Sequence, residues 1–411
     1  MKAALKTFVH DTKRIALLAL LALTCCLRSL PAAELDEAKL AQIGPAMQKF
    51  VDQKDLAGAV AVVGRHDKVV ATAVVGFQNL ADKTPMQADT LFRIASMTKP
   101  ITAVGVMILV DEGKLKIDDP VEKHLPEFRG QKLRTKDPDG GTRLVEPARL
   151  VTIRDLMTHT SGMAGGLPRE PANLYIKRDH TLTDAVKLFA KEPLDFQPGA
   201  KWQYCNTGID TLGRLVEVGS GQSFETFMQK RVFDPLGMKD TTFYPTPAQA
   251  KRLAVTYGVE KGELVASKGD IIGVPPGAKY PIPAGGLCST GPDIARFYRM
   301  MLNGGTLDGR RILSPESVKT MTTLQTGEIV CGFTSGMGFG LGFAVVRQPQ
   351  GVTAMLSPGA FGHGGAFGTQ SWADPKQDLI LIMLIQRTGL PNGDASTMRQ
   401  EFQKIAVGAL K

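Results

Sequence analysis

The chain has 411 residues, of which 43% are apolar and 22% charged, an ordinary globular composition with enough apolar material for a large core. This length predicts either one large domain with an inserted subdomain or two domains. The formal net charge is +9, but residues 1–33 carry +4 of it, because they contain five basic residues and one acidic residue. The remaining +5 is spread without runs of like charge, so the composition excludes an obvious nucleic-acid-binding surface.

Residues 1–33 have the pattern of a secretory signal peptide. Basic residues up to Arg14 are followed by an apolar run over residues 15–27 and then by Pro31-Ala32-Ala33 before Glu34. The apolar run is short for a membrane span. We therefore expect export to the periplasm or beyond after cleavage near Ala33, which leaves peripheral membrane or cell-wall proximity open.

The remaining elements predict strands near both ends of the chain and helices between them. Thr152 with Asp155 and Thr290 with Asp293 mark the starts of two helices as capping boxes. The pattern predicts an α+β fold: an antiparallel sheet built from N- and C-terminal strands, flanked by helices, with a mostly helical inserted subdomain at about residues 96–330. In chain order, we expect helices at residues 35–53, 183–191, 207–218, 223–232 and 396–410, and strands at residues 57–64, 68–76, 339–347, 368–373 and 378–386.

A central helix is expected to open at Ser96-Met97-Thr98-Lys99 and to stop at Gly113. Only Thr102 is polar between residues 101 and 110, so this helix has no solvent-facing side and should be buried. A serine in its first turn lies near free backbone N–H groups and the positive end of the helix dipole. Lys99 projects from the same face, and burial would lower its pKa from roughly 10.4 until the amine is a usable base. A solvated lysine after an N-cap serine is the alternative.

A loop over residues 197–208 contains Tyr204 and Asn206, which point the same way if the loop is extended. A tyrosine near Lys99 could carry a proton to the leaving group, and Asn206 could orient a substrate amide or the lysine. A buried tyrosine with a satisfied hydroxyl is the structural alternative. Cys205 is read as a small buried residue, with a reactive thiol as the other interpretation.

A glycine-rich segment at residues 361–368 leads into an expected strand and contains His363, Gly364, Gly365 and Ala366. Its glycines would let a substrate backbone approach closely and add as an extra strand. The N–H of Ala366 could complete an oxyanion hole with that of Ser96. A glycine-rich bend without function is the alternative.

Cysteines and histidines give no sign of a metal centre. Cys25 and Cys26 lie in the leader, where lipidation would make a lipoprotein, although neither follows the small residue that lipidation needs. Removal of the leader leaves Cys205, Cys288 and Cys331, an odd and sparse set that is no disulfide framework. There is no Cys-x-x-Cys or His-Glu-x-x-His spacing, so we expect neither a metal nor another cofactor.

Together these segments resemble the serine β-lactamase and penicillin-binding-protein superfamily, closest to its class C branch, which includes D-peptidases and carboxylesterases. The chain has one Ser-x-x-Lys, Tyr204-Cys205-Asn206 matches the Tyr-x-Asn element, and His363-Gly364-Gly365 stands where Lys-Thr-Gly or His-x-Gly is found. Matching segments at residues 156–163 and 233–238 extend the resemblance over most of residues 35–411. Gly-x-Ser-x-Gly does not occur, which weakens an α/β-hydrolase interpretation.

The resemblance implies that Ser96 is acylated, that Lys99 and Tyr204 handle protons, and that the N–H groups of Ser96 and Ala366 form the oxyanion hole. It makes His159, a tempting catalytic histidine, structural. The implied catalytic residues are Ser96, Lys99 and Tyr204, and the implied substrate-binding residues are Asn206, His363, Gly365 and Ala366.

The segment His363-Gly364-Gly365 departs from the family pattern, in which a fixed cation and a hydroxyl are common. A histidine is mostly neutral at pH 7, so the carboxylate of a penicillin loses its obvious anchor. Acidification toward pH 6 should then charge His363 and favour a cephalosporin over an ester. An arginine from the insert could supply the anchor instead, with Arg143, Arg149 and Arg169 as the sources.

The sequence thus predicts an exported serine hydrolase that forms an acyl-enzyme on Ser96 and passes the acyl group to water. Esters or D-amino-acid-type amides are the expected substrates, and β-lactams are secondary ones. No nucleic acid is expected as a partner. The alternatives are a true class C-like β-lactamase, and a penicillin-binding sensor or scaffold whose acyl-enzyme does not turn over.

Overall fold

A computed structural model describes residues 34–166, 173–269 and 272–411. The expected signal segment at residues 1–33 and Arg169 lie outside the described residues. Contacts divide the chain into Met1–Leu35 with Lys411 and a second unit from Asp36 to Leu410. All elements described below belong to the second unit.

One antiparallel sheet contains the strands β1 (Gly58–Gly64), β2 (Val69–Asn79), β3 (Thr84–Pro85), β12 (Met337–Phe339), β13 (Ala344–Val346), β14 (Phe361–Gly364), β15 (Gln370–Asp374) and β16 (Leu379–Leu384). Their order is β12-β13-β14-β15-β16-β1-β2-β3. Strands from the two ends of the chain meet where β1 pairs with β16, with Val62 opposite Ile382. The predicted sheet built from both chain ends is confirmed.

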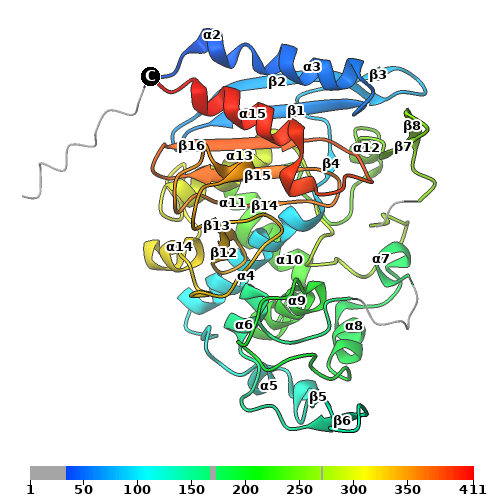
Figure 1. The fold of residues 1–411 in the computed structure, drawn as a ribbon, viewed down its shortest axis with the longest axis vertical. Coiled ribbons are helices and arrows are strands. Elements are labelled where there is room, and N and C mark those ends of the chain that lie inside the picture. Colours follow the sequence, from blue (N-terminus) through cyan, green and yellow to red (C-terminus); the bar gives the residue numbers. More distant parts are fainter. Residues whose placement is uncertain (1–33, 167–172, 270–271) are drawn as a thin grey trace, which may run out of the picture. The chain divides into compact units, whose positions relative to one another are not determined.

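Helices cover both faces of this sheet; they are α2 (Glu37–Leu40), α3 (Ile43–Asp52), α13 (Gly291–Leu302) and α15 (Thr397–Gly408). The start of α13 lies against Val60 and Val62, whereas α3 lies against Ala73, which pairs with Ala61. Because alternate residues of a strand point to opposite faces, α3 and α13 cover opposite sides. β1 is therefore buried along its whole length, which explains its unbroken apolar sequence. α15 packs beside α3 (Figure 1).

The central helix is α4 (Thr98–Asp111), which follows a 3₁₀ turn at Ala95–Met97. Every residue of α4 from Thr98 to Leu109 is buried, as predicted from its unbroken apolar run. The helix begins two residues later than expected, so Ser96 lies in the preceding turn. Pro100 falls in the first turn of α4, where a missing N–H costs little.

The chain between β3 and β12 is mostly helical, as predicted. Thr152 caps α6 in a capping box with Asp155, and Thr290 caps α13. None of the helices in the described ranges is both long and apolar enough to cross a membrane. Besides α4 and α13, the α-helices described between β3 and β12 are α5 (Val121–His124), α6 (Ile153–Thr158), α7 (Leu174–Lys177), α8 (Leu182–Phe189), α9 (Asn206–Ser220), α10 (Phe224–Met228), α11 (Asp234–Leu236), α12 (Pro247–Ala250) and α14 (Pro315–Thr322).

Some strands differ from the sequence-based expectation. The single strand expected at residues 339–347 is two strands, β12 and β13, joined by a turn in which Gly342 has a φ of 79°. A Cβ at Gly342 would lie 2.5 Å from that of Ala103, so the glycine lets this turn pack against α4. Four short pairs were not predicted: β4 (Phe92–Arg93) with β9 (Cys288–Ser289), β5 (Leu133–Lys136) with β6 (Thr142–Val145), β7 (Tyr257–Glu260) with β8 (Glu263–Ala266), and β10 (Thr306–Leu307) with β11 (Arg310–Arg311).

Candidate active site

Ser96 lies in the 3₁₀ turn between β4 and α4, and this turn is fixed from its N-terminal side. β4 pairs with β9, and the N–H of Ile94 donates to the carbonyl of Leu287 at 3.0 Å. Ala95 has a φ of 45°, in the left-handed region that side chains other than glycine avoid. The serine is therefore held in a strained turn, an arrangement common at functional sites.

Lys99 lies one turn after Ser96 and has no solvent exposure. Its Nζ donates to Ser96 Oγ at 3.0 Å and to the carbonyl of Ala284 at 2.7 Å, and lies 4.6 Å from the ring centroid of Tyr204. Burial disfavours the ammonium form and lowers the pKa of Lys99 to about 7, although the charge of Asp210 opposes this shift. Much of the amine is therefore neutral at neutral pH and can accept a proton.

Tyr204 approaches Ser96 from the other side, because its hydroxyl donates to Ser96 Oγ at 2.7 Å. Burial raises the pKa of Tyr204, so the hydroxyl keeps its proton at neutral pH. One serine oxygen thus accepts hydrogen bonds from both Lys99 and Tyr204. The structure brings these three sequence-predicted residues into direct contact.

His159 holds the loop that carries Tyr204. Its carbonyl accepts from the N–H of Gln203 at 2.9 Å, and its Nδ1 accepts from the N–H of Cys205 at 3.1 Å. The His159 and Tyr204 rings lie 4.7 Å apart between centroids. Burial lowers the pKa of His159 well below its ordinary value, so the ring is a neutral support for both neighbours of Tyr204.

Cys205 and Asn206 lie at the start of α9. The Cys205 Sγ accepts from the N–H of Gly208 at 3.3 Å as the N-cap of the helix, and burial raises the pKa of its thiol. The thiol is therefore a buried cap and not an activated nucleophile. Asn206 is the first residue of α9 and lies outside the lining of the pocket that contains Ser96, so its contact with substrate stays a prediction.

His363 lies in β14 and is buried, with Nδ1 2.7 Å from the carbonyl oxygen of Gly364. Burial, assisted by the positive charge of Lys99, lowers the pKa of His363 to about 4. The imidazole is therefore neutral at pH 6 as well as at pH 7. The expectation that mild acid would charge this position is wrong, because it assumed the pKa of an exposed histidine.

The glycines after His363 make room for other parts of the protein. A Cβ on Gly364 would lie 1.9 Å from Asp394 Oδ1, and a Cβ on Gly365 would lie 2.5 Å from the carbonyl oxygen of Ile94. Gly365 thus lets the end of β14 lie directly against the turn that carries Ser96. This differs from the sequence-based interpretation, in which the glycines made room for a substrate backbone.

Ser96 lies in the wall of a pocket of about 410 Å³. Two parts of its wall were not singled out from the sequence: Phe333, which is 52% exposed, and the turn before α15. Leu390-Pro391-Asn392-Gly393-Asp394 is a recognisable turn sequence, but nothing in it indicates which part of the fold it faces. The lining consists of Ser96, Tyr204, Phe333, His363, Gly364, Gly365, Ala366, Leu390, Pro391, Asn392, Gly393 and Asp394.

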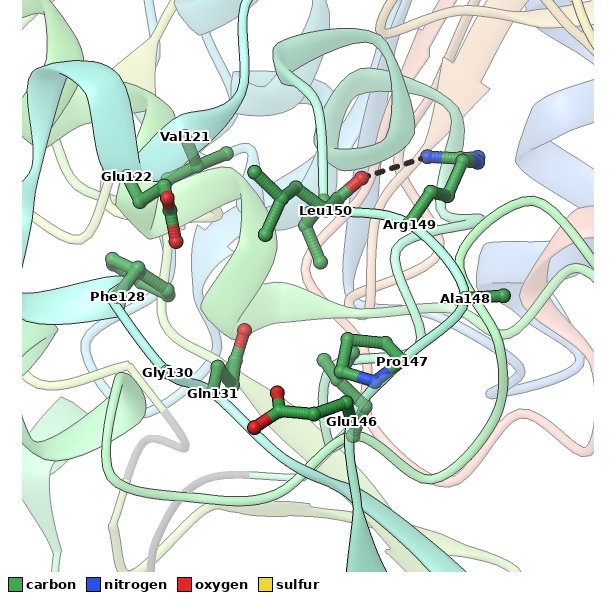
Figure 2. A pocket seen from close by; sticks show the side chains of 12 residues that line it. Val121, Glu122, Phe128, Gly130, Gln131, Glu146, Pro147, Ala148, Arg149 and Leu150 are labelled. Atoms are coloured by element: carbon green, nitrogen blue, oxygen red, sulfur yellow. Dashed lines mark hydrogen bonds between the residues drawn. The ribbon is translucent and has the colours of Figure 1, made fainter.

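The arginines considered as carboxylate anchors have other partners. Arg149 lines a second pocket, of about 280 Å³, and its side chain turns toward the carbonyl of the next residue (Figure 2). Its guanidinium also binds both carboxylate oxygens of Asp155, at 2.6 and 2.8 Å. Arg143 pairs with Asp137 at 3.2 Å. The described lining of the Ser96 pocket contains neither arginine nor lysine.

Asp210 of α9 is a buried carboxylate that the sequence analysis missed. Its Oδ1 accepts from the N–H of Ala284 at 2.7 Å, and its Oδ2 accepts from the hydroxyls of Tyr175 and Tyr280 at 2.5 Å each. Burial raises the pKa of Asp210 to about 6. Because the carbonyl of Ala284 accepts from Lys99, one residue connects this carboxylate to the amine beside Ser96.

Comparisons with known proteins place the chain in a family. The chain matches the Beta-lactamase family over residues 45–403. Protein Rv1367c of Mycobacterium tuberculosis is 37% identical, over 83% of this chain and 88% of that protein. Esterase EstB of Burkholderia gladioli is 32% identical, over 86% of this chain and 92% of that protein. Among solved structures, EstCE1, a hydrolase with promiscuous acyltransferase activity, has a TM-score of 0.75 at 25% identity and covers 91% of this chain and 98% of that one.

The chain belongs to the beta-lactamase family, as the resemblance in its motifs indicated. Within that family it is a serine hydrolase of the β-lactamase-related kind.

Proposed function

We propose that the protein is an exported ester hydrolase that forms an acyl-enzyme on Ser96. D-amino-acid-type amides are related substrates, and β-lactams are secondary ones. The observation that carries the proposal is the convergence of two proton-transfer groups on Ser96 Oγ, Lys99 Nζ at 3.0 Å and the Tyr204 hydroxyl at 2.7 Å. A nucleophile with an adjacent base and a second proton donor is what acyl transfer requires.

In the proposed acylation step, neutral Lys99 takes the proton of Ser96 as Oγ attacks the ester carbonyl carbon. The carbonyl electrons move onto oxygen, where the N–H groups of Ser96 and Ala366 stabilise the negative charge. The bond to the alcohol then breaks, and the leaving oxygen takes the hydroxyl proton of Tyr204. The ammonium of Lys99 returns a proton to Tyr204, so the amine is neutral again.

In deacylation water is the nucleophile, and Lys99 is again the base. Water attacks the acyl carbon and gives a proton to Lys99, and the oxyanion forms at the same pair of N–H groups. When the bond to Ser96 breaks, Oγ takes the proton from the Lys99 ammonium. The free acid leaves, and the serine hydroxyl and neutral amine are restored.

The charges around the pocket support esters as the first substrates. The imidazole of His363 is neutral, and the described lining contains neither arginine nor lysine. A β-lactam brings a carboxylate that must lose water on binding, and a charge-assisted hydrogen bond to compensate would contribute roughly 1.5 to 3 kcal/mol. A neutral ester needs no such partner, and the relative EstB is named an esterase.

A substrate panel with intact-mass detection tests this function. Small activated esters, a D-amino-acid amide and a chromogenic cephalosporin are compared, and peptide mapping locates the acyl group. We expect linear ester turnover through an adduct on Ser96 and a higher kcat/KM for esters than for the cephalosporin. A burst that leaves a permanent adduct would favour a penicillin-binding sensor or scaffold, and preference for the cephalosporin a true β-lactamase.

We also propose that the protein is exported, since residues 1–33 have the composition of a signal peptide. The mature protein is then periplasmic or secreted and begins near Glu34. Mass spectrometry of the N-terminal peptide from cell fractions measures this. Full-length chain recovered from membranes with acylated Cys25 or Cys26 would establish a lipoprotein instead.

A further inference from the structure

The carboxylate of Asp394 lies beside the part of β14 that lines the Ser96 pocket. Asp394 belongs to a 3₁₀ turn, Gly393–Ala395, between β16 and α15. Its Oδ1 occupies the space where a Cβ on Gly364 would lie, and accepts from Gln370 Nε2 at 3.0 Å. Glycine at position 364 is therefore what admits an acidic group to this wall of the pocket.

No Lys, Arg or His side chain among the described residues lies within ion-pair distance of the Asp394 carboxylate. Arg399 donates to the backbone carbonyl of Asp394, and its positive charge interacts with the Asp394 carboxylate. Its guanidinium is fully buried over the Trp372 ring, 4.3 Å from the centroid, and lies outside the pocket lining. His363 is neutral. Asp394 therefore brings the one carboxylate of the described lining to this wall of the pocket, where a bound cation could approach it.

Aromatic surface lines the same pocket. Phe333 is half exposed there, and its ring centroid lies 5.0 Å from that of Tyr204. A partly desolvated cation is attracted both by an aromatic face and by a carboxylate. A substrate ammonium group would find both in this pocket, whereas a substrate carboxylate would meet repulsion from Asp394.

We propose that Asp394 selects substrates by charge, so that the preferred esters carry an ammonium group and carboxylate-bearing substrates are disfavoured. The inference rests on the proposed ester hydrolysis at Ser96 and names the substrate class of that site. It also gives position 364 a role: a larger residue there would displace the carboxylate that makes the selection.

Three para-nitrophenyl esters test the inference: the ester of gamma-(trimethylammonio)butyrate, its uncharged tert-butyl isostere and an adipate monoester. Each kcat/KM is divided by the hydroxide-catalysed rate of the same ester. At low ionic strength we expect the ammonium ester to exceed its isostere by about tenfold and the carboxylate ester to fall about tenfold below it. In Asp394→Asn both ratios should approach one.

Asp55→Asn is the matched control. Asp55 is half-buried like Asp394 but lines a neighbouring pocket that shares Leu390, Pro391 and Asn392 with the Ser96 pocket. Its variant should keep the wild-type ratios, because the charge it removes faces another space. Wild-type and Asp394→Asn enzymes with equal ratios would overturn the inference, as would a wild-type enzyme that favours the uncharged or carboxylate ester.

Failure of the proposed function is separately visible in the same assay. If wild-type enzyme does not hydrolyse the uncharged isostere, or if Ser96→Ala hydrolyses it equally well, ester hydrolysis at Ser96 is wrong. If the isostere is turned over and Ser96 is needed, only the charge ratios decide the role of Asp394. Equal or reversed wild-type ratios overturn the inference even if Asp394→Asn fails to fold.

Discussion

The two pockets that contain Ser96 and Arg149 differ mainly in how their charges are compensated. In the pocket of about 280 Å³ beside the β5–β6 hairpin, two of the charged lining residues, Glu146 and Arg149 (Figure 2), have partners of opposite charge. Arg149 binds Asp155 through two hydrogen bonds, and Lys132 pairs with Glu146. In the pocket of about 410 Å³, Ser96 instead contacts a fully buried lysine that has no carboxylate within ion-pair distance among the described residues.

This difference separates a structural pocket from a reactive one. The hydrogen-bonded carboxylate of Asp155 raises the pKa of Arg149, so the guanidinium keeps its proton and its charge. Burial lowers the pKa of Lys99 to about 7 and raises that of Tyr204, because neither charged form is well compensated. Reactivity thus follows from burial without a close counter-ion, and not from a concave surface alone.

Removal of the nucleophile from the reactive pocket should have the largest effect on activity. We expect Ser96→Ala to lower ester kcat/KM by at least about a thousandfold, because no other group in the pocket can form the acyl-enzyme. Intact-mass measurement with a fluorophosphonate should show one adduct on wild type and none on the variant. Ser289→Ala is the control, since Ser289 is buried outside the pocket. An adduct that survives Ser96→Ala would contradict the assignment.

The second prediction concerns the base. We expect Lys99→Met to lower kcat/KM by at least about a hundredfold, the low end for a positioned proton-transfer group. In wild type, kcat/KM should rise with pH through about 7, because the amine must lose its proton before it can act. A pH series from 5 to 9 measures both effects in one assay. Wild-type rates in the variant would make Lys99 a structural residue.

Elements with local signals were predictable from the sequence. The apolar runs of α4 and β1 depend on neighbours in the chain, so the buried helix and the sheet were both found. Ser96 and Lys99 are three residues apart, and one helical turn places them together. The split between β12 and β13 was missed because it depends on Gly342 packing against a helix more than two hundred residues earlier in the chain.

The rest of the pocket could not be predicted, because it depends on tertiary packing. Asp394 and Phe333 come from turns that meet Ser96 only after the sheet and insert have formed. Asp210 is one acidic residue in an otherwise ordinary helix, and its partners Tyr175 and Tyr280 lie on separate segments. The pKa of a side chain also depends on tertiary packing, because burial shifts it. Nothing in the sequence therefore indicated that His363 stays neutral at pH 6.

The third prediction is that burial of Lys99 makes the stability of the protein depend on pH. Between pH 7 and about 10, the unfolded chain holds a proton on Lys99 that the folded chain has released. Stability contributed by this group must therefore rise with pH over that window, by up to roughly 1.4 kcal/mol per pH unit. The free energy of unfolding of wild type should therefore rise between pH 7 and pH 10, whereas that of Lys99→Met has no such contribution. Urea unfolding should show that the difference, Lys99→Met minus wild type, falls by a few kcal/mol over this range.

Exposed Lys319→Met is the control for this stability measurement. Its difference from wild type should stay constant over the same pH range, because an exposed amine keeps its hydration on folding. If the difference in free energy of unfolding between Lys99→Met and wild type also stays constant with pH, folding does not lower the pKa of Lys99.

The fourth prediction tests the buried carboxylate behind the base. Asp210→Asn keeps the shape, and Tyr175 and Tyr280 can turn their hydroxyls to accept from the new amide. The variant loses the negative charge that raises the pKa of Lys99, so the acid limb of kcat/KM should move to lower pH. We expect the rate at pH 6, relative to the plateau, to rise about two- to threefold, because the wild-type carboxylate is itself partly protonated there. Buried Asp293→Asn is the matched control and should leave the limb in place.

The smallest effect is expected at the paired pocket, where Arg149→Gln removes the guanidinium that was considered as an anchor for carboxylates. About half of the Arg149 side chain is exposed, but Asp155 is buried, so loss of the guanidinium costs more than the roughly 1 kcal/mol of a fully exposed pair. Asp155 also keeps its hydrogen bonds from the N–H and hydroxyl of Thr152, so α6 stays capped. We therefore expect a loss of stability of about 1 to 3 kcal/mol, with ester and cephalosporin kcat/KM each within about twofold of wild type. Arg143→Gln, on the exposed β5–β6 hairpin, is the matched control. A selective loss of cephalosporin hydrolysis in Arg149→Gln alone would show that this arginine reaches the Ser96 pocket during turnover, and the separation of the two pockets would then fail.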